Sequence, residues 1–312
     1  MGRAQGARAV MALAFESVFG TPPVSGFFQM PFASTTLGGK SGLLPGDLLG
    51  YGRDPQAPQK DLIDVSGDIV VPVDAVAFGY WLKALLGAPT TTGAGPYTHT
   101  FTSGGASLPS LSIEKQMPEA SSYAMMKGLM ANSMTMTLQR GGLLTASIGL
   151  MGMGEDSATT SQAGSLAAIE LRRFGQYQAT IDRDGSPLGN VPSLELNFSN
   201  NMEAADTAGN GGMLAGIDPG MTSLTGKATT RFADTVLLTQ AVDGTSCELE
   251  VGFVNGADSL TMTLHEVYLS RPAREITGPQ GIQCSFDLMG AKASSPARMM
   301  TAVLVNDIAS YA

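Results

Sequence analysis

The sequence predicts a mainly β protein made of two tandem β units, each flanked by one short α-helix. The composition favours this class, because 39 glycines and a charged fraction of only 14% are typical of a turn-rich β protein. Apolar and polar residues also alternate with period two in many short segments, as they do in strands with one buried face. Finally, several segments recur in the same order in the two halves of the chain. A hydrophobic content of 43% is sufficient for a sizeable core.

The clearest element is a β-hairpin over Ser133–Gly152. Apolar residues alternate with polar ones along Met134–Gln139, and again along Leu144–Leu150. The turn Arg140–Gly142 separates the two runs, and its paired glycines accept positive φ without steric cost. We therefore expect two antiparallel strands joined at this turn.

The second half of the chain contains counterparts of these segments. Leu150-Met151-Gly152 recurs as Leu288-Met289-Gly290, and Val65-Ser66-Gly67 resembles Leu224-Thr225-Gly226. Each match is short, and their shared order carries the inference of a duplicated unit. The alternative is that β-rich segments resemble one another by chance.

The duplication predicts a first unit at 1–165 and a second at 166–312. The polar, small-residue segment Asp156–Ser165 forms the expected linker region between them.

The first unit is expected to contain several strands and one helix. The helix is Val76–Leu86, where apolar residues follow helical spacing, with Asp74 as N-cap and Gly87 as C-cap. Two Gly-rich insertions, Gly38–Lys60 and Thr90–Gly105, are expected to be irregular and ordered by contacts with neighbouring subunits. Besides the hairpin, the predicted strands are Phe27–Phe32, Leu62–Pro72, Leu111–Lys115 and Tyr123–Met130, with a small hairpin at Tyr97–Thr102.

The second unit repeats this plan with shorter connections. Its helix is Asp234–Val242, ended by Gly244, and an irregular loop is expected over Met202–Gly220. Met299–Ile308 is expected to be a terminal strand or a docking tail. The other predicted strands are Leu194–Phe198, Ser223–Arg231, Glu248–Phe253, Ser259–Leu269 and Ile282–Leu288.

The charge balance argues against a protein that grips nucleic acid. The formal net charge is −9, and residues 175–312 carry most of it. A phosphate backbone needs clustered Lys and Arg, so this chain is better suited to repelling it. No apolar run is long enough for a membrane helix, and the short apolar start gives no convincing signal peptide. Cys247 and Cys284 are expected to pack in strands as small hydrophobes.

No pattern in the sequence predicts a catalytic, cofactor-binding or metal site. The two histidines, His99 and His265, lie far from any Cys/His or acidic cluster with metal-ligand spacing. Gly220–Ala228 resembles a phosphate loop, but its spacing is one residue too long and Ala228 stands where Ser or Thr must bind Mg²⁺. We therefore expect no cofactor, and an enzyme is the least favoured class.

The chain resembles the major tail tube proteins of long-tailed (siphovirus-type) bacteriophages, in a form with a duplicated tube domain. The likeness is carried by Phe15–Pro22 (FESVFGTP), Ser110–Lys115 and the hairpin within Ala131–Gly152. It implies a β-sandwich or half-barrel with a flanking helix. It also implies that subunits form rings whose inner sheets join into a barrel, and that stacked rings form a conduit for DNA and the tape-measure protein.

The resemblance also implies partners and surfaces. The partners are other copies of the chain, the tape-measure protein, and the tail terminator and distal tail proteins, with viral DNA passing without specific binding and no membrane. Acidic residues proposed to face the lumen are Glu114, Glu248, Glu250 and Asp287. Residues proposed to contact neighbouring rings are Gly39, Lys40, Asp47, Tyr51, Arg53, Tyr97, His99 and Phe101.

Two units per chain favour a trimeric, pseudo-hexameric ring, and a hexamer is the alternative if the repeat is chance. Other functions left open are a different β-rich virion part, such as a head decoration or tail-completion protein, and a surface adhesin-type β-sandwich. The absence of a secretion signal and the aromatic content of 6% count against the adhesin.

Overall fold

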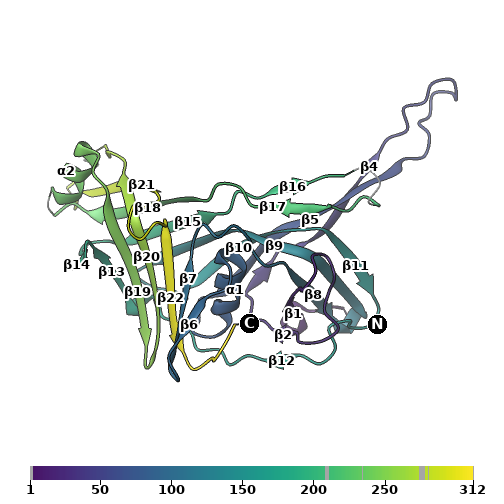
Figure 1. Cartoon of the computed structure of the whole chain (residues 1–312). Coiled ribbons are helices and arrows are strands. Elements are labelled where there is room, and N and C mark those ends of the chain that lie inside the picture. The colour runs from purple at the N-terminus through teal and green to yellow at the C-terminus, as the bar shows by residue number, and fades with distance from the viewer. Residues whose placement is uncertain (1–2, 208–210, 234, 274–277, 280, 312) are drawn as a thin grey trace.

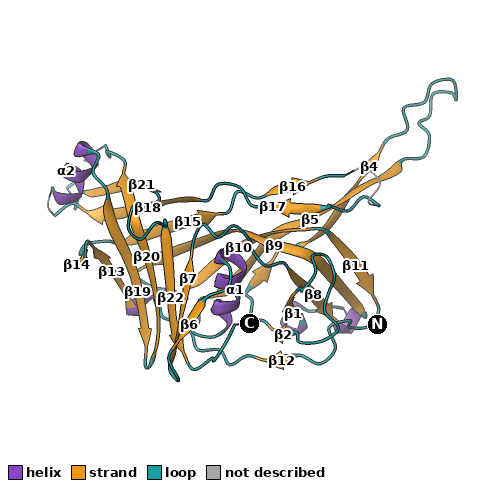
Figure 2. Cartoon of the chain, viewed as in Figure 1, coloured by secondary structure: helices purple, strands orange, loops and turns teal. Residues whose placement is uncertain are grey.

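The computed structural model describes residues 3–207, 211–233, 235–273, 278–279 and 281–311. It is mainly β, as predicted, with two α-helices among the described residues. A long sheet crosses the molecule, helix α1 (Ala77–Leu86) lies against its inner side, and a thin hairpin arm projects from one end (Figure 1). Figure 2 shows how strands dominate this arrangement.

The long sheet passes without a break from the first half of the chain into the second. Its strands pair in the spatial order β5–β10–β9–β15–β18–β21–β20, all antiparallel, with β3 and β4 along the outer edge of β5. The bounds are β3 Ser34–Thr35, β4 Gly38–Leu44, β5 Gln59–Pro72, β9 Ser122–Gln139, β10 Thr145–Gly152, β15 Ser193–Ser199, β18 Ser223–Arg231, β20 Asp258–Leu269 and β21 Gln283–Gly290.

A second sheet belongs to the first half. Strand β9 is long enough to serve both sheets: its early residues pair with β8 and β11, and its later ones with β10 and β15. The remaining pairings are β8–β1, β1–β2 and β2–β12. The bounds are β1 Val10–Phe15, β2 Phe28–Gln29, β8 Leu111–Met117, β11 Gly154–Ala158 and β12 Ala167–Ala168.

The second half has a corresponding second sheet, and strands of the first half complete it. Strand β20 pairs with β19 and β22, β19 pairs with β13, and β13 pairs with β14. On the far side of β22 lie β7 and then β6, which come from the first half. The bounds are β6 Thr90–Thr92, β7 Tyr97–Thr102, β13 Ala179–Arg183, β14 Ser186–Pro187, β19 Cys247–Asn255 and β22 Met300–Asn306.

Helix α1 fills the space between the sheets of the first half, and all ten of its residues are buried. The N-cap position is Val76, two residues later than the predicted Asp74, but Asp74 still binds the start of the helix, because Oδ1 accepts the backbone N–H groups of Val76 and Ala77, each at 2.6 Å. Gly87 ends the helix at φ +93°. Helix α2 (Val236–Asp243) ends at Gly244 in the left-handed region, also as predicted, while Asp234 of the predicted helix lies outside the described residues.

Most predicted strands are present, and the central hairpin of β9 and β10 is confirmed. The small hairpin predicted at Tyr97–Thr102 is wrong in its bounds, since these residues form the single strand β7, whose hairpin partner is β6 at Thr90–Thr92. The predicted terminal strand is β22. Cys247 and Cys284 are buried free thiols. The strand expected at Phe27–Phe32 is reduced to the two residues of β2, since Pro31 cannot donate to a ladder.

Two segments predicted to be irregular contain hairpins instead. Gly38–Lys60 includes β4 and the start of β5, and Met202–Gly220 includes the paired strands β16 (Glu203–Ala205) and β17 (Gly216–Asp218). These strands project away from the core or lie on its edge, so they lack the alternation of apolar and polar residues that identifies a half-buried strand.

Candidate functional site: the exposed face of the long sheet and the projecting arm

One face of the long sheet packs on the core and the other is open. Along each strand, the residues that alternate with the core positions line up in rows across the strands, because the registers match. One row crosses the entire sheet. Its residues, in spatial order, are Ser34, Val70, Ser147, Thr135, Asn197, Thr225, Met289 and Tyr268.

The neighbouring rows differ in character, one being rich in hydroxyl groups and another in charged groups. One row is Asp68, Gly149, Ser133, Ser199 and Ser223. Another places Thr137, Glu195, Lys227 and Asp287 side by side, so its charges alternate in sign. The face therefore offers short polar side chains over a wide area, with opposite charges adjacent to one another.

The second feature is the arm formed by β4, β5 and the connection between them. It extends well beyond the body of the molecule (Figure 1). Large apolar side chains are exposed along it, which is unusual for a surface that stays in water. These residues are Leu43, Leu44, Leu48, Leu49, Tyr51, Leu62 and Ile63.

A scan against protein families matches residues 6–290 to the family described as phage tail tube protein. The chain belongs to that family. No curated protein matches this chain. The tail tube protein is thus a β-rich structural component of the virion tail and not an enzyme, and its family polymerises with itself.

The described residues contain no group of three or more His, Cys, Asp or Glu side chains placed to hold a metal ion. In the described part of the chain, neither helix has the length and apolar character needed to cross a membrane.

The acidic residues predicted to face the lumen are distributed over several surfaces. Asp287 lies on β21, on the open face of the long sheet. Glu248 and Glu250 lie on β19, in the second sheet of the second half, where Glu248 contacts His265 Nδ1 at 3.3 Å. The described face therefore includes Asp287 but neither glutamate of β19.

The prediction for Glu114 is wrong, because this residue is fully buried. Its Oε2 accepts hydrogen bonds from Gln116 Nε2 (2.6 Å) and Ser161 Oγ (2.7 Å), and its Oε1 accepts one from the Gln162 backbone N–H (2.6 Å). A buried carboxylate with three donors ties the linker to β8. Sequence alone gave no sign of these donors, which lie up to 48 residues away.

The arm carries five of the predicted inter-ring residues. Gly39 and Lys40 lie on β4, and Asp47, Tyr51 and Arg53 lie in the exposed connection between β4 and β5. At the base of the arm, the Gly39 N–H donates to Glu155 Oε2 at 2.6 Å, which fixes β4 to the neighbouring strand β11. Their role between rings stays a prediction.

His99 and Phe101 were also predicted to contact neighbouring rings, and the structure contradicts this, because both are fully buried on β7. The His99 ring contacts the Ile308 carbonyl through Nε2 at 2.8 Å and stacks edge-on against Tyr311. The reason is the pairing of β7 with β22, about 200 residues further along the chain. Tyr97, at the start of β7, is half-buried and remains a candidate.

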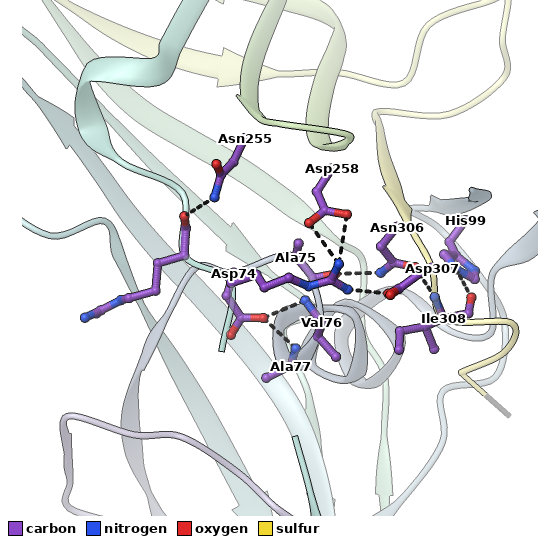
Figure 3. A network of polar contacts seen from close by, with 12 residues as sticks. Asp74, Ala75, Val76, Ala77, His99, Asn255, Asp258, Asn306, Asp307 and Ile308 are labelled. Carbon is purple, nitrogen blue, oxygen red and sulfur yellow. Dashed lines mark hydrogen bonds and ion pairs between the residues drawn. The ribbon is translucent and has the colours of Figure 1, made fainter. Parts of the chain in front are cut away.

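A polar network joins the two halves of the tail tube protein beside α1 (Figure 3). Arg172, near the start of the second half, forms ion pairs with Asp258 and Asp307. Asn306 donates to the Ala75 carbonyl, while Asp74 and Arg173 form an isolated backbone bridge. Ion pairs and backbone bonds therefore hold the first helix, β22 and the start of the second half together.

Asp74 is the ionisable group of this network whose charge state matters most for stability. Burial raises the pKa of its carboxyl to about 6, although the backbone N–H groups at the start of α1 oppose the shift. Oδ2 is buried without a hydrogen-bond partner, whereas Oδ1 accepts two. Burial also raises the pKa of Tyr311, whose hydroxyl donates to the Val76 carbonyl at 2.9 Å.

Sequence reasoning missed the role of Glu16 within the segment Phe15–Pro22, which carries part of the family resemblance. Its Oε1 accepts from Ser112 Oγ (2.6 Å) and from the Gly128 N–H (2.8 Å), and its Oε2 accepts from the Gly20 N–H (2.8 Å). One carboxylate thus holds the loop after β1 against β8 and β9. A glutamate directly after an apolar strand was the available signal.

Proposed function

We propose that this chain forms rings whose long sheets join edge to edge, and that stacked rings make a tube through which DNA and the tape-measure protein pass. The observation that carries the proposal is the continuous antiparallel sheet with one face buried and one polar face open. Such a sheet has edges that must be paired or protected, and ring closure removes them.

The chain is composed of two related units, approximately 1–165 and 166–312. The support is that the same set of pairings occurs twice: β5–β10–β9–β8–β1 with β11 beside β9, and β18–β21–β20–β19–β13 with β22 beside β20. The helices also occupy equivalent places in the sequence, since α1 comes after β5 and before β8, and α2 comes after β18 and before β19. Specific pairs agree too, since Leu150 pairs with Gly67 and Leu288 pairs with Gly226.

Three chains per ring follow from two units per chain. Each chain contributes two sheet segments, so three chains give six segments around a lumen, which is a pseudo-sixfold wall. The pairing of β9 with β15 is the joint between units inside one chain. A hexamer of chains remains the alternative.

The open face suits a passage for a polyanion. Hydroxyl groups and alternating charges present no cluster of Lys and Arg, so a phosphate backbone finds no strong binding site. The acidic contribution to this face comes from residues such as Asp287, and its neighbour Lys227 offsets it. The lumen is therefore less acidic than the net charge of the chain suggests. At the ends of the tube we expect the tail terminator and distal tail proteins to bind.

The test is to purify the chain, induce assembly, and count subunits per ring by image averaging of tube cross-sections and by native mass spectrometry. Tubes with three chains per ring support the whole proposal. Six chains per ring would refute the argument from duplication, and globular particles under all assembly conditions would refute the tube.

A further inference from the structure

The long sheet ends at β4, whose far side is a free edge. Among the strands that the structure describes, β5 is the one that pairs with β4. The Thr36 N–H donates to the Asp68 carbonyl of β5 at 2.9 Å. Because successive residues of a strand point their backbone groups to alternate sides, those of Leu37 and Gly39 point away from β5, toward the edge.

Two charged side chains of the same subunit occupy these edge groups. Lys115 Nζ, from β8, donates to the Leu37 carbonyl at 2.7 Å, and the Gly39 N–H donates to Glu155 Oε2, on β11, at 2.6 Å. Glycine makes room for both, because a Cβ at Gly39 would lie 3.2 Å from Glu155 Oε2 and one at Gly38 would lie 3.4 Å from Lys115 Nζ. We call Lys115 and Glu155 the edge cap.

The second half has the corresponding edge on β15, and there a strand covers it. The register of β4 on β5 matches that of β15 on β18, so that Gly39 corresponds to Phe198. Phe198 lies opposite Met134 of β9. Two residues further along the same side, the Asn200 N–H donates to the Asn132 carbonyl of β9 at 2.7 Å. The backbone groups that the cap occupies in the first half therefore correspond to groups that pair with a neighbouring unit.

The positions of the cap are apolar in the second half. Lys115 corresponds to Val251 and Glu155 to Met300, because each pair holds the same place in the strand pairing of its half. Val251 and Met300 are buried. Charged side chains thus lie at the edge that is free in a single subunit, and apolar ones lie at the joint that the chain itself closes. Charges directed at an edge are a means by which β proteins prevent unwanted strand pairing.

We propose that the edge cap holds unassembled subunits apart and opens when the long sheet of a second copy pairs along β4. The inference rests on the proposed joining of sheets within a ring, and it adds a control on when that joining begins. The incoming strand supplies an N–H to the Leu37 carbonyl and a carbonyl to the Gly39 N–H, so each group exchanges one partner for another. Because the cap must open before the first contact forms, it slows the start of assembly.

The test is the lag before tube growth in purified subunits, followed by light scattering. Lys115→Met/Glu155→Ala should shorten the lag at least fivefold, because both edge groups are then free to pair. The matched control is Lys127→Met/Asp156→Ala, which removes a side-chain ion pair (2.6 Å) between β9 and β11 that contains no backbone group of β4. Its lag should not change.

An equal or longer lag in the cap variant, or the same shortening in the control, would overturn the edge cap while leaving the tube intact. If the unsubstituted chain forms no rings or tubes, the proposed function fails instead. A second measurement, hydrogen exchange of the Gly39 amide, needs only the single variant Glu155→Ala. Exchange should be at least tenfold faster in free variant subunits than in free native ones, and equally slow in tubes of both, since a neighbouring carbonyl then accepts this N–H. Unchanged exchange in free subunits, or fast exchange in variant tubes, would also overturn the proposal.

Discussion

Asp74→Asn should make the folded chain more stable at pH 8 and leave its stability almost unchanged near pH 3.5. The folded-state pKa of Asp74 is about 6 against 3.8 in the unfolded chain, because burial disfavours the charged form. A raised pKa means that the protonated carboxyl is favoured in the fold. The native chain is therefore fully stabilised below pH 3.8, and it loses that stability as the pH rises toward and through 6.

The magnitude follows from the difference between the two pKa values. About two pKa units correspond to about 3 kcal/mol at 1.36 kcal/mol per unit. Asn is neutral at every pH, and its side-chain oxygen can still accept the N–H groups of Val76 and Ala77 that Asp74 accepts. The variant should therefore gain up to about 3 kcal/mol relative to the native chain between pH 4 and pH 8.

The assay is urea denaturation of unassembled subunits from pH 3.5 to pH 8, followed by fluorescence of Trp81. This tryptophan is fully buried on the helix whose start Asp74 binds, so its emission reports on the affected region. Asp47→Asn on the exposed arm is the control and should show no such pH-dependent gain. A variant that is equally destabilised at pH 3.5 and pH 8 would refute the reasoning, because only the hydrogen bonds to the start of the helix would then matter.

Three other substitutions test single contacts. Glu114→Ala should cost about 3–5 kcal/mol, since three donors, of which Gln116 is buried, lose their acceptor, and Glu114→Gln should recover part of that loss in the same denaturation assay. Glu16→Ala should cost about 2–3 kcal/mol and increase proteolysis of the loop after β1, which limited digestion would detect; an unchanged digestion pattern would contradict it. Gly67→Ala should lower Tm by several degrees, because φ is +146° there and a Cβ would lie 2.7 Å from the Leu37 backbone, whereas Gly141→Ala in an open turn should not.

The parts of the fold that could be predicted from sequence are those set by local pattern. Alternation along Met134–Gln139 identifies a strand because one face of it is buried, and Asp74 followed by helical spacing identifies α1. The arm was predicted as a loop because both of its faces are exposed, so no burial constrains the alternation of its residues. A hairpin that packs on no core shows little alternation of apolar and polar residues, so its strands are hard to predict from sequence.

The same distinction applies to the candidate contact and lumen residues: local sequence predicts the exposure of some, whereas distant segments bury others. Residues of the arm could be recognised as exposed from their Gly-rich surroundings. The burial of His99 and Phe101 could not, because β22 and Tyr311 cover them from the far end of the sequence. Glu114 was proposed to face the lumen, but it is buried, because its three donors come from β8 itself and from the linker, which the sequence does not place beside each other.

The exchange of strands between the halves has a consequence for synthesis. Strand β7 and helix α1 are covered by β22 and Tyr311, which leave the ribosome about 200 residues later. The first half therefore emerges with an unpaired strand and an uncovered helix, and it reaches its final packing only when the second half has been translated.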